Sequence, residues 1–157
     1  MNEQGMWSRR EFAAGVAAFF FVGLRGKRLV AEPPVTLVVY KSKSCGCCAK
    51  WVDHVKAAGF KLEVHDEETM DPLKDELGIP PQVRSCHTAL VGGYVIEGHV
   101  PASDIQRLLS SRPKLAGLAV PGMPGGTPGM AEPGSKIGDF EVVAFQTNGS
   151  TDVFARH

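Results

Sequence analysis

Four cysteines are the residues of this chain best suited to chemistry. Three of them, Cys45, Cys47 and Cys48, lie within four positions of one another. The fourth, Cys86, comes directly before His87. Thiolates are both the nucleophiles of disulfide exchange and preferred ligands of Cu(I) and zinc. The cysteines therefore predict either a soft-metal site or a redox site.

The first three cysteines lie on a predicted turn from a strand to a helix. Residues 35–40 are an apolar, β-branched run of strand length, and residues 48–58 have helical periodicity, with apolar side chains on one face. At such a turn, unpaired backbone N–H groups and the positive end of the helix dipole stabilise a thiolate. Three nearby lysines add positive charge: Lys41, Lys43 and Lys50.

The rest of the first 112 residues predicts an α/β fold. Further strands are expected at 60–65, where Val64 belongs to the apolar face of a half-buried strand, and at 87–91 and 94–97, which a tight turn at Gly92-Gly93 joins. Further helices are expected at 71–77 and 101–112. This order is that of a thioredoxin-like mixed sheet with flanking helices. In thioredoxin-like proteins the segment before the third strand approaches the first strand-to-helix turn. The resemblance therefore implies that Cys86 faces the other three cysteines.

The chain divides into four predicted segments. Residues 1–31 contain Ser8-Arg9-Arg10-Glu11-Phe12 and a following apolar run, which together indicate a twin-arginine-type export signal, or a membrane anchor if it is not cleaved. Residues 35–112 form the thioredoxin-like domain. Residues 113–138 are a Gly/Pro/Met-rich loop, and 139–157 form a C-terminal β-hairpin around Asn148-Gly149. This hairpin could extend the sheet or clasp the loop.

Charge gives no support to nucleic-acid binding. The chain has 17 basic and 17 acidic residues, but five of the basic ones lie in the first thirty positions. From residue 31 onward the net formal charge is about −3. We therefore expect no nucleic-acid partner.

The spacing of the cysteines favours copper over other metals. Cu(I) suits thiolate and thioether ligands, and adjacent thiolates can bridge two ions, so a small multinuclear Cu(I)-thiolate site is expected. Structural zinc sites usually show two spaced pairs of ligands, and the second pair is missing here. Further candidate ligands are His87, Met123 and Met130; each has an alternative structural role. His99 is interpreted as a surface or loop-packing histidine, and His54 and His65 as solvated.

Thiol chemistry is the alternative function. Cys45 and Cys48 form a C-x-x-C pattern at a helix N-terminus, as in thioredoxin-like oxidoreductases. Cys47 would divert a disulfide between them, and Cys86-His87 stands where those enzymes usually have a cis-proline. The sequence therefore favours metal binding over thiol-disulfide or copper oxidoreductase activity.

Several motifs together resemble the CopG-type family of exported bacterial copper-resistance proteins. They are Cys45-Gly46-Cys47-Cys48, Ser85-Cys86-His87-Thr88-Ala89, the stretch 93–102 (GYVIEGHVPA), and the stretch 117–130 with its two Pro-Gly-Met triplets. The resemblance implies a periplasmic thioredoxin-like copper protein with its metal on the four cysteines. Its partners would be copper ions and other periplasmic copper-handling proteins.

Overall fold

The computed structural model describes residues 35–131 and 138–157. The predicted export signal, and residues 132–137 of the Gly/Pro-rich loop, lie outside the described residues. Within the described ranges, no helix is long and apolar enough to cross a membrane.

The described part of the chain forms seven strands, three α-helices and one short 3-10 helix. In chain order they are β1 (Thr36–Ser42), α1 (Gly46–Ala57), β2 (Lys61–Glu67), α2 (Asp71–Glu76), η1 (Pro81–Val83), β3 (His87–Val91), β4 (Tyr94–Glu97), α3 (Ala102–Ser111), β5 (Gly117–Ala119), β6 (Glu141–Phe145) and β7 (Thr151–Arg156). Every strand and helix predicted between residues 35 and 112 is present.

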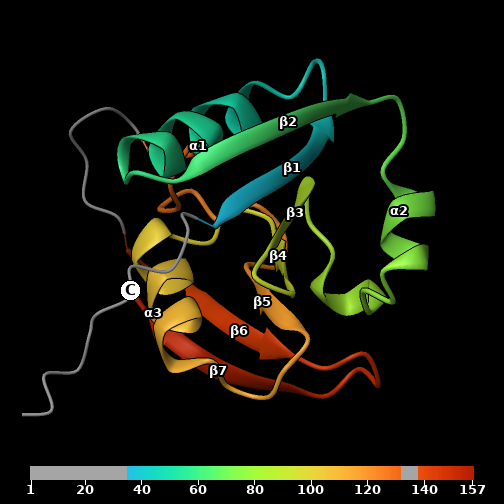
Figure 1. Cartoon of the computed structure of the whole chain (residues 1–157), viewed down its shortest axis with the longest axis vertical. Helices are drawn as coiled ribbons and strands as arrows, with labels where there is room; N and C mark the ends of the chain where they lie inside the picture. Colours follow the sequence, from blue (N-terminus) through green and yellow to red (C-terminus); the bar gives the residue numbers. More distant parts are fainter. Residues whose placement is uncertain (1–34, 132–137) are drawn as a thin grey trace, which may run out of the picture. The chain divides into compact units, whose positions relative to one another are not determined.

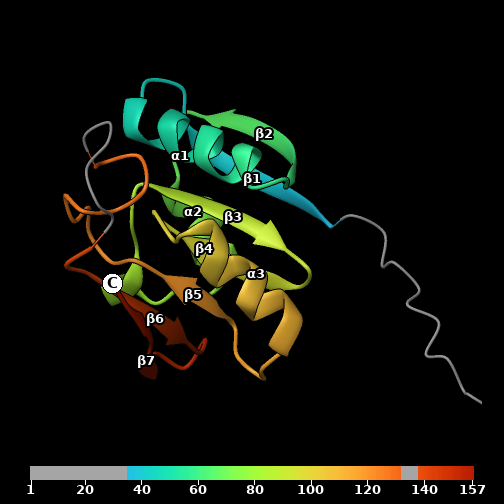
Figure 2. The same cartoon turned by 90° about the vertical axis from the view of Figure 1, so that its left-hand side faces the viewer.

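All seven strands belong to one mixed sheet in the order β2-β1-β3-β4-β5-β6-β7. The pairs β1–β2 and β4–β5 are parallel, and the other pairs are antiparallel. Helices α1 and α3 lie on one face of the sheet and α2 lies on the other (Figures 1 and 2). The expected thioredoxin-like fold with flanking helices is therefore confirmed.

The predicted start of the Gly/Pro-rich loop is wrong. Residues 117–119, predicted as loop, form the buried strand β5 beside β4. Gly117 fits there because a Cβ at this position would lie only 2.0 Å from the carbonyl oxygen of Val95. The C-terminal hairpin then pairs through β6 with β5, so it extends the sheet.

The main core lies between the sheet and the pair α1 and α3. Trp51 and Val55 of α1 and Ile105 and Leu108 of α3 are fully buried in it. The indole N–H of Trp51 donates a hydrogen bond to the Val100 carbonyl at 2.8 Å. This bond ties α1 to the segment between β4 and α3, which also carries His99.

Two predictions about burial on this half of the fold are wrong. Val64, expected to face the core, is 42% exposed, because β2 is an edge strand with a neighbour on one side only. His54 is not simply solvated, since its Nε2 accepts a hydrogen bond from the backbone N–H of Ala102, the first residue of α3. His65 remains on the polar side, stacked on Tyr40.

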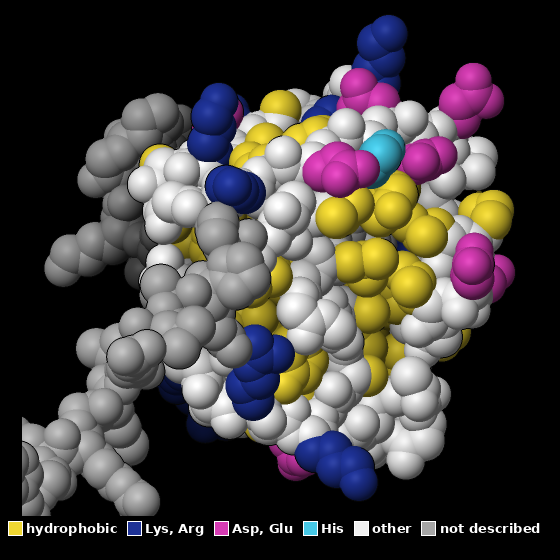
Figure 3. Space-filling model, in the orientation of Figure 1, with side chains coloured by type: hydrophobic (Ala, Val, Ile, Leu, Met, Phe, Trp, Pro, Cys, Tyr) yellow, Lys and Arg dark blue, Asp and Glu magenta, His cyan; other side chains and the backbone are white. Residues whose placement is uncertain are grey.

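On the face shown in Figure 3, hydrophobic and charged side chains are interspersed. The Lys and Arg side chains lie around the rim rather than in one group. This face therefore has no concentrated basic surface.

Candidate metal centre

The end of β1 and the start of α1 position the three clustered cysteines. Cys45 occupies the N-cap of α1, with its N–H bonded to the Ser42 carbonyl and its own carbonyl accepting from the N–H of Ala49. The helical turn then places Cys48 fully inside the core, whereas Cys45 and Cys47 are half-buried. Two of the three sulfurs are thus left facing the space above the helix N-terminus.

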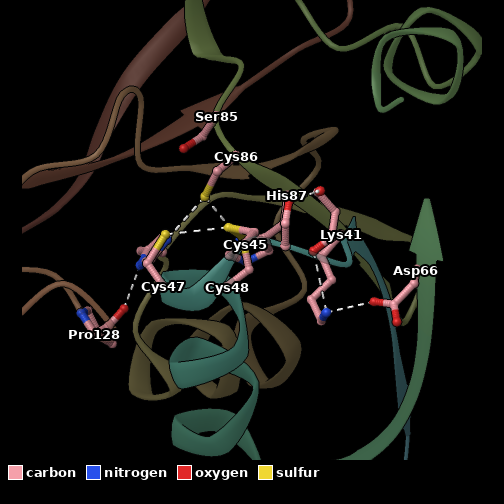
Figure 4. The surroundings of a disulfide bond; sticks show 12 residues. Lys41, Cys45, Cys47, Cys48, Asp66, Ser85, Cys86, His87 and Pro128 are labelled. Atoms are coloured by element: carbon pink, nitrogen blue, oxygen red, sulfur yellow. Dashed lines mark hydrogen bonds and ion pairs between the residues drawn. A yellow bond between two sulfur atoms is a disulfide. The ribbon is translucent and has the colours of Figure 1, made fainter. Parts of the chain in front are cut away.

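The four cysteine sulfurs lie close together. Cys45 and Cys48 form a disulfide, and the Sγ atoms of Cys45 and Cys47 are 3.5 Å apart. Cys86 reaches the same place from the segment before β3, and its sulfur points toward those at the N-terminus of α1 (Figure 4). All four Sγ atoms lie within 4.8 Å of one another. The fold therefore gathers the cysteines as expected, and Cys47 does not divert the Cys45–Cys48 disulfide.

A buried ion pair holds the segment that carries Cys86. Lys74 of α2 and Glu97 of β4 pair in the interior, where they are 2% and 0% exposed. The Ser85 N–H donates to Glu97 Oε1 at 2.6 Å, and Lys74 Nζ donates to the Ser85 carbonyl at 3.1 Å. The Thr88 hydroxyl donates to the other Glu97 oxygen at 2.7 Å. Through these hydrogen bonds the ion pair holds the segment that stands where thioredoxins have a cis-proline; the described residues contain no cis peptide bond.

His99 belongs to the centre, although the sequence interpretation placed it at the surface or in loop packing. It is fully buried, and its Nε2 lies 3.1 Å from Cys86 Sγ. Its Nδ1 lies 2.6 Å from the carbonyl oxygen of Pro128, so it does also contact the loop. The sequence did contain an indication that His99 lies beside Cys86. The β3–β4 register pairs Thr88 with Glu97, and its continuation by two positions puts Cys86 opposite His99.

His87 also points toward the cysteines rather than away from them. Its Nδ1 lies 3.4 Å from Cys86 Sγ, and its ring packs 4.3 Å from that of Trp51. The side chain is fully buried, and its Nε2 has no hydrogen-bond partner among the residues that the structure describes. An unpaired buried nitrogen is costly, which is typical of a group with a role beyond packing.

Residues 121–131, here called the strap, cover the centre from the loop side. Gly129 packs against the first turn of α1, where a Cβ would lie 2.7 Å from the Cys47 carbonyl oxygen. The Ser85 hydroxyl donates to the Gly122 carbonyl at 2.6 Å. Of the two methionines considered as ligands, Met130 is half-buried beside Gly129, whereas Met123 is 55% exposed.

The charge around the sulfurs is only partly as predicted. Lys41 pairs with Asp66 at 2.6 Å, so its charge is offset (Figure 4). The pKa of the Cys86 thiol is raised to about 11, mainly by burial and to a smaller extent by the charge of the neighbouring Cys47. Cys86 lies off the helix N-terminus, and therefore the thiolate stabilisation expected at the turn does not extend to it.

The free energy of unfolding is expected to fall as the pH drops below 6.5. The pKa of His87 is lowered well below 6.5, the ordinary pKa of histidine, mainly by burial and to a smaller extent by the charges of His99, Lys74 and Lys41. Burial also lowers the pKa of His99. The unfolded chain thus takes up protons at a pH where the folded chain does not, with a slope that grows as the pH falls and reaches at most about 1.4 kcal/mol per pH unit for each histidine. Urea unfolding of the metal-free protein from about pH 7.5 to about pH 5.5 measures this slope. The slope should survive in His65→Gln, and a constant free energy of unfolding over this range would contradict the prediction.

Comparison with known proteins gives two kinds of match. The family description "protein of unknown function, DUF411" matches residues 83–130, which include Cys86, His99 and most of the strap. Two solved structures, titled copper resistance protein CopG, form 1 and form 2, are 42% and 41% identical to the chain. Each match covers 80% of this chain and 98% or 99% of the other, with TM-scores of 0.73 and 0.72. No curated protein matches the chain.

Proposed function

Because the chain belongs to the CopG family of copper resistance proteins, we propose that it binds copper as Cu(I) on Cys45, Cys47, Cys48 and Cys86. The observation that carries the proposal is the approach of four sulfurs from two chain segments to within 4.8 Å of one another. Thiolates are among the ligands that Cu(I) prefers. The proposed binding form is the reduced one, in which the addition of two electrons and two protons has opened the Cys45–Cys48 disulfide into two thiols.

More than one Cu(I) ion is expected in the reduced site. Thiolates at adjacent positions can bridge ions, and Cu(I) accepts two or three ligands. Four thiolates can therefore serve several ions at once. His87 is proposed as a further ligand because its Nδ1 lies 3.4 Å from Cys86 Sγ. Met130 is proposed as another because it follows Gly129, which packs against the backbone of Cys47; Met123 would have to move inward from its exposed position.

The proposed role is copper resistance in the periplasm. The location is supported by the twin-arginine pattern Ser8-Arg9-Arg10-Glu11-Phe12, and the role by the titles of the similar structures, which name copper resistance. The protein would sequester Cu(I), or exchange it with other periplasmic copper-handling proteins.

A second candidate function is thiol-disulfide or copper oxidoreductase activity. It is favoured by the disulfide between Cys45 and Cys48 at the N-terminus of α1. Closing this disulfide from two thiols releases two electrons and two protons, which is enough to reduce two Cu²⁺ ions to Cu⁺.

Copper content and free thiols, measured on reduced protein loaded with Cu(I), test the proposal. Wild type should hold more than one copper per chain, and Cys86→Ala should lose most of it because the sulfur opposite the helix is gone. The matched control Ser44→Ala, at an exposed position beside the cluster, should bind copper as wild type does. A wild-type protein that stays free of copper while Cys45 and Cys48 cycle reversibly would favour the oxidoreductase instead.

A further inference from the structure

We infer that the free edge of β2 binds a second copy of this chain, so that two sheets join antiparallel about a two-fold axis at Val64. β2 is the outermost strand on its side of the sheet, with β1 on its inner side (Figures 1 and 2). Among the described residues, the backbone hydrogen bonds of β2 go to β1 alone. Within this part of the chain, the outward N–H and C=O groups of β2 are therefore open to another strand.

The two edges of the sheet differ in how well they could pair with another strand. All seven residues of β2 pair with β1 one for one, without a register shift. The other edge strand, β7, pairs with β6 through a register shift between Val142 and Val143, and the Phe154 carbonyl of β7 already accepts a hydrogen bond from Arg107 of α3. Bulges and covering groups are common devices that prevent edge pairing. The regular edge is thus that of β2.

Charged side chains also protect edge strands, but those of β2 follow an order that fits a second copy. Lys61 is its first residue and Glu67 its last, and neither forms an ion pair with another described residue. An antiparallel pairing centred on Val64 places Lys61 of each copy opposite Glu67 of the other. It also places Glu63 opposite His65, whose ring can donate to the carboxylate. Opposite charges at opposed positions of two strands are favourable.

The same register covers the exposed apolar side chain of this edge. Val64 is 42% exposed, and the pairing places the Val64 side chains of the two copies against each other. The register can shift only in steps of two, because side chains on the same face must meet. A shift of two residues would place Glu63 opposite Glu63 or opposite Glu67, which is unfavourable. The register centred on Val64 is also the one that pairs the whole strand.

The pairing leaves the metal centre of each copy complete and separate. The cysteines at the start of α1 follow the carboxyl end of β1, and β1 is parallel to β2. Antiparallel pairing of two β2 strands therefore directs the two centres toward opposite ends of the joined sheet. A contact between two seven-residue strands is smaller than a standard interface, so we expect a weak dimer.

Sedimentation velocity of the full chain tests the inference, at concentrations from about 1 µM to about 1 mM and with a reductant that excludes disulfide-linked dimers. Wild type should change from monomer to dimer within this range. Val64→Glu should raise the Kd of the dimer at least about tenfold, because two carboxylates then face each other at the axis. Val153→Glu is the matched control: Val153, on β7, is 44% exposed, so this variant should dimerise as wild type does. A monomeric wild type, or equal dimerisation of Val64→Glu and wild type, would overturn the inference.

Exchange of the end charges tests the register. Lys61→Glu and Glu67→Lys should each weaken the dimer, because each places like charges opposite one another at two positions. The double variant restores both pairs and should dimerise as wild type does. A double variant as weak as the two single ones would contradict the register.

A cross-link at the axis gives a second measurement of the register. Opposed residues of antiparallel strands have Cα atoms about 4.5–5.5 Å apart, which a disulfide can span. Mild oxidation of Val64→Cys should therefore join two copies through this position, as mapped by mass spectrometry of the linked peptides, whereas Val153→Cys should give no such link. Equal linkage at the two positions would contradict the pairing. Val64→Glu should keep the copper content of wild type, so the inference and the proposed function can fail independently.

Discussion

Replacement of Glu97 by glutamine is expected to lower the free energy of unfolding by about 3–5 kcal/mol, the usual cost of breaking a buried ion pair. The variant leaves the Lys74 ammonium buried with only neutral partners, which are the Ser85 carbonyl and the Thr88 hydroxyl. Burial raises the pKa of Glu97, which shows that the site is poorly solvated and that the charge depends on Lys74 beside it. Urea denaturation at neutral pH measures the loss.

The same variant should also disturb the metal centre. Glu97 accepts the Ser85 N–H, and a neutral amide oxygen accepts it more weakly than a carboxylate, so one of the two attachments between the ion pair and the segment before Cys86 becomes weaker. We expect faster reaction of the Cys86 thiol with a thiol reagent, compared in a Cys47→Ser background so that a single free thiol remains. Glu141→Gln is the matched control, because its partnership with Arg156 is exposed and should contribute no more than about 1 kcal/mol. Equal losses in Glu97→Gln and Glu141→Gln would refute the role of the buried pair.

Replacement of Gly129 by alanine is expected to lift the strap from the cysteines. Gly129 has φ +91°, a backbone conformation that costs a residue with a side chain about 1–3 kcal/mol. Its Cβ would also lie 2.7 Å from the Cys47 carbonyl oxygen and 3.2 Å from His99 Nδ1. The clash should break the His99–Pro128 hydrogen bond and make Cys47 more reactive toward a thiol reagent, alongside a loss of stability of that size.

Gly125→Ala provides the comparison within the same strap. A Cβ at Gly125 meets nothing within 4 Å, so this change should leave both stability and Cys47 reactivity close to those of wild type. If both alanine variants behaved alike, the tight packing of Gly129 on α1 would not be what holds the strap down.

Local patterns were enough to predict the first half of the fold. The β-branched run before Cys45, the periodicity after it and the Gly92-Gly93 turn each determine structure over a few residues, and the structure has them as expected. Strand β5 could not be found in this way. It has three residues and begins with a glycine, and it forms because β4 and β6 offer partners on both sides.

The four cysteines of the candidate site and the candidate ligand His87 were predicted from the sequence, but the place of His99 was not. The thioredoxin-like order of elements brought Cys86 to the other cysteines, because topology alone decides that approach. His99 was missed because it was judged from its own turn, Gly98-His99-Val100-Pro101. The hairpin register, which places it opposite Cys86, was already available from the two-residue turn. Lys74 and Glu97 lie in two elements that share no sequence pattern, so local patterns could not predict this buried ion pair.

The pairing of β5 with β6 has a consequence for how tightly the centre can hold an ion. The chain leaves the sheet after Ala119, forms the strap, and returns at Glu141, with Ala119 opposite Val143. Both ends of the covering segment are therefore anchored in neighbouring strands, so the entropy cost of closing this loop is incurred when the protein folds. An arriving ion then meets donors that are preorganised, and less of its binding free energy is spent on ordering the chain.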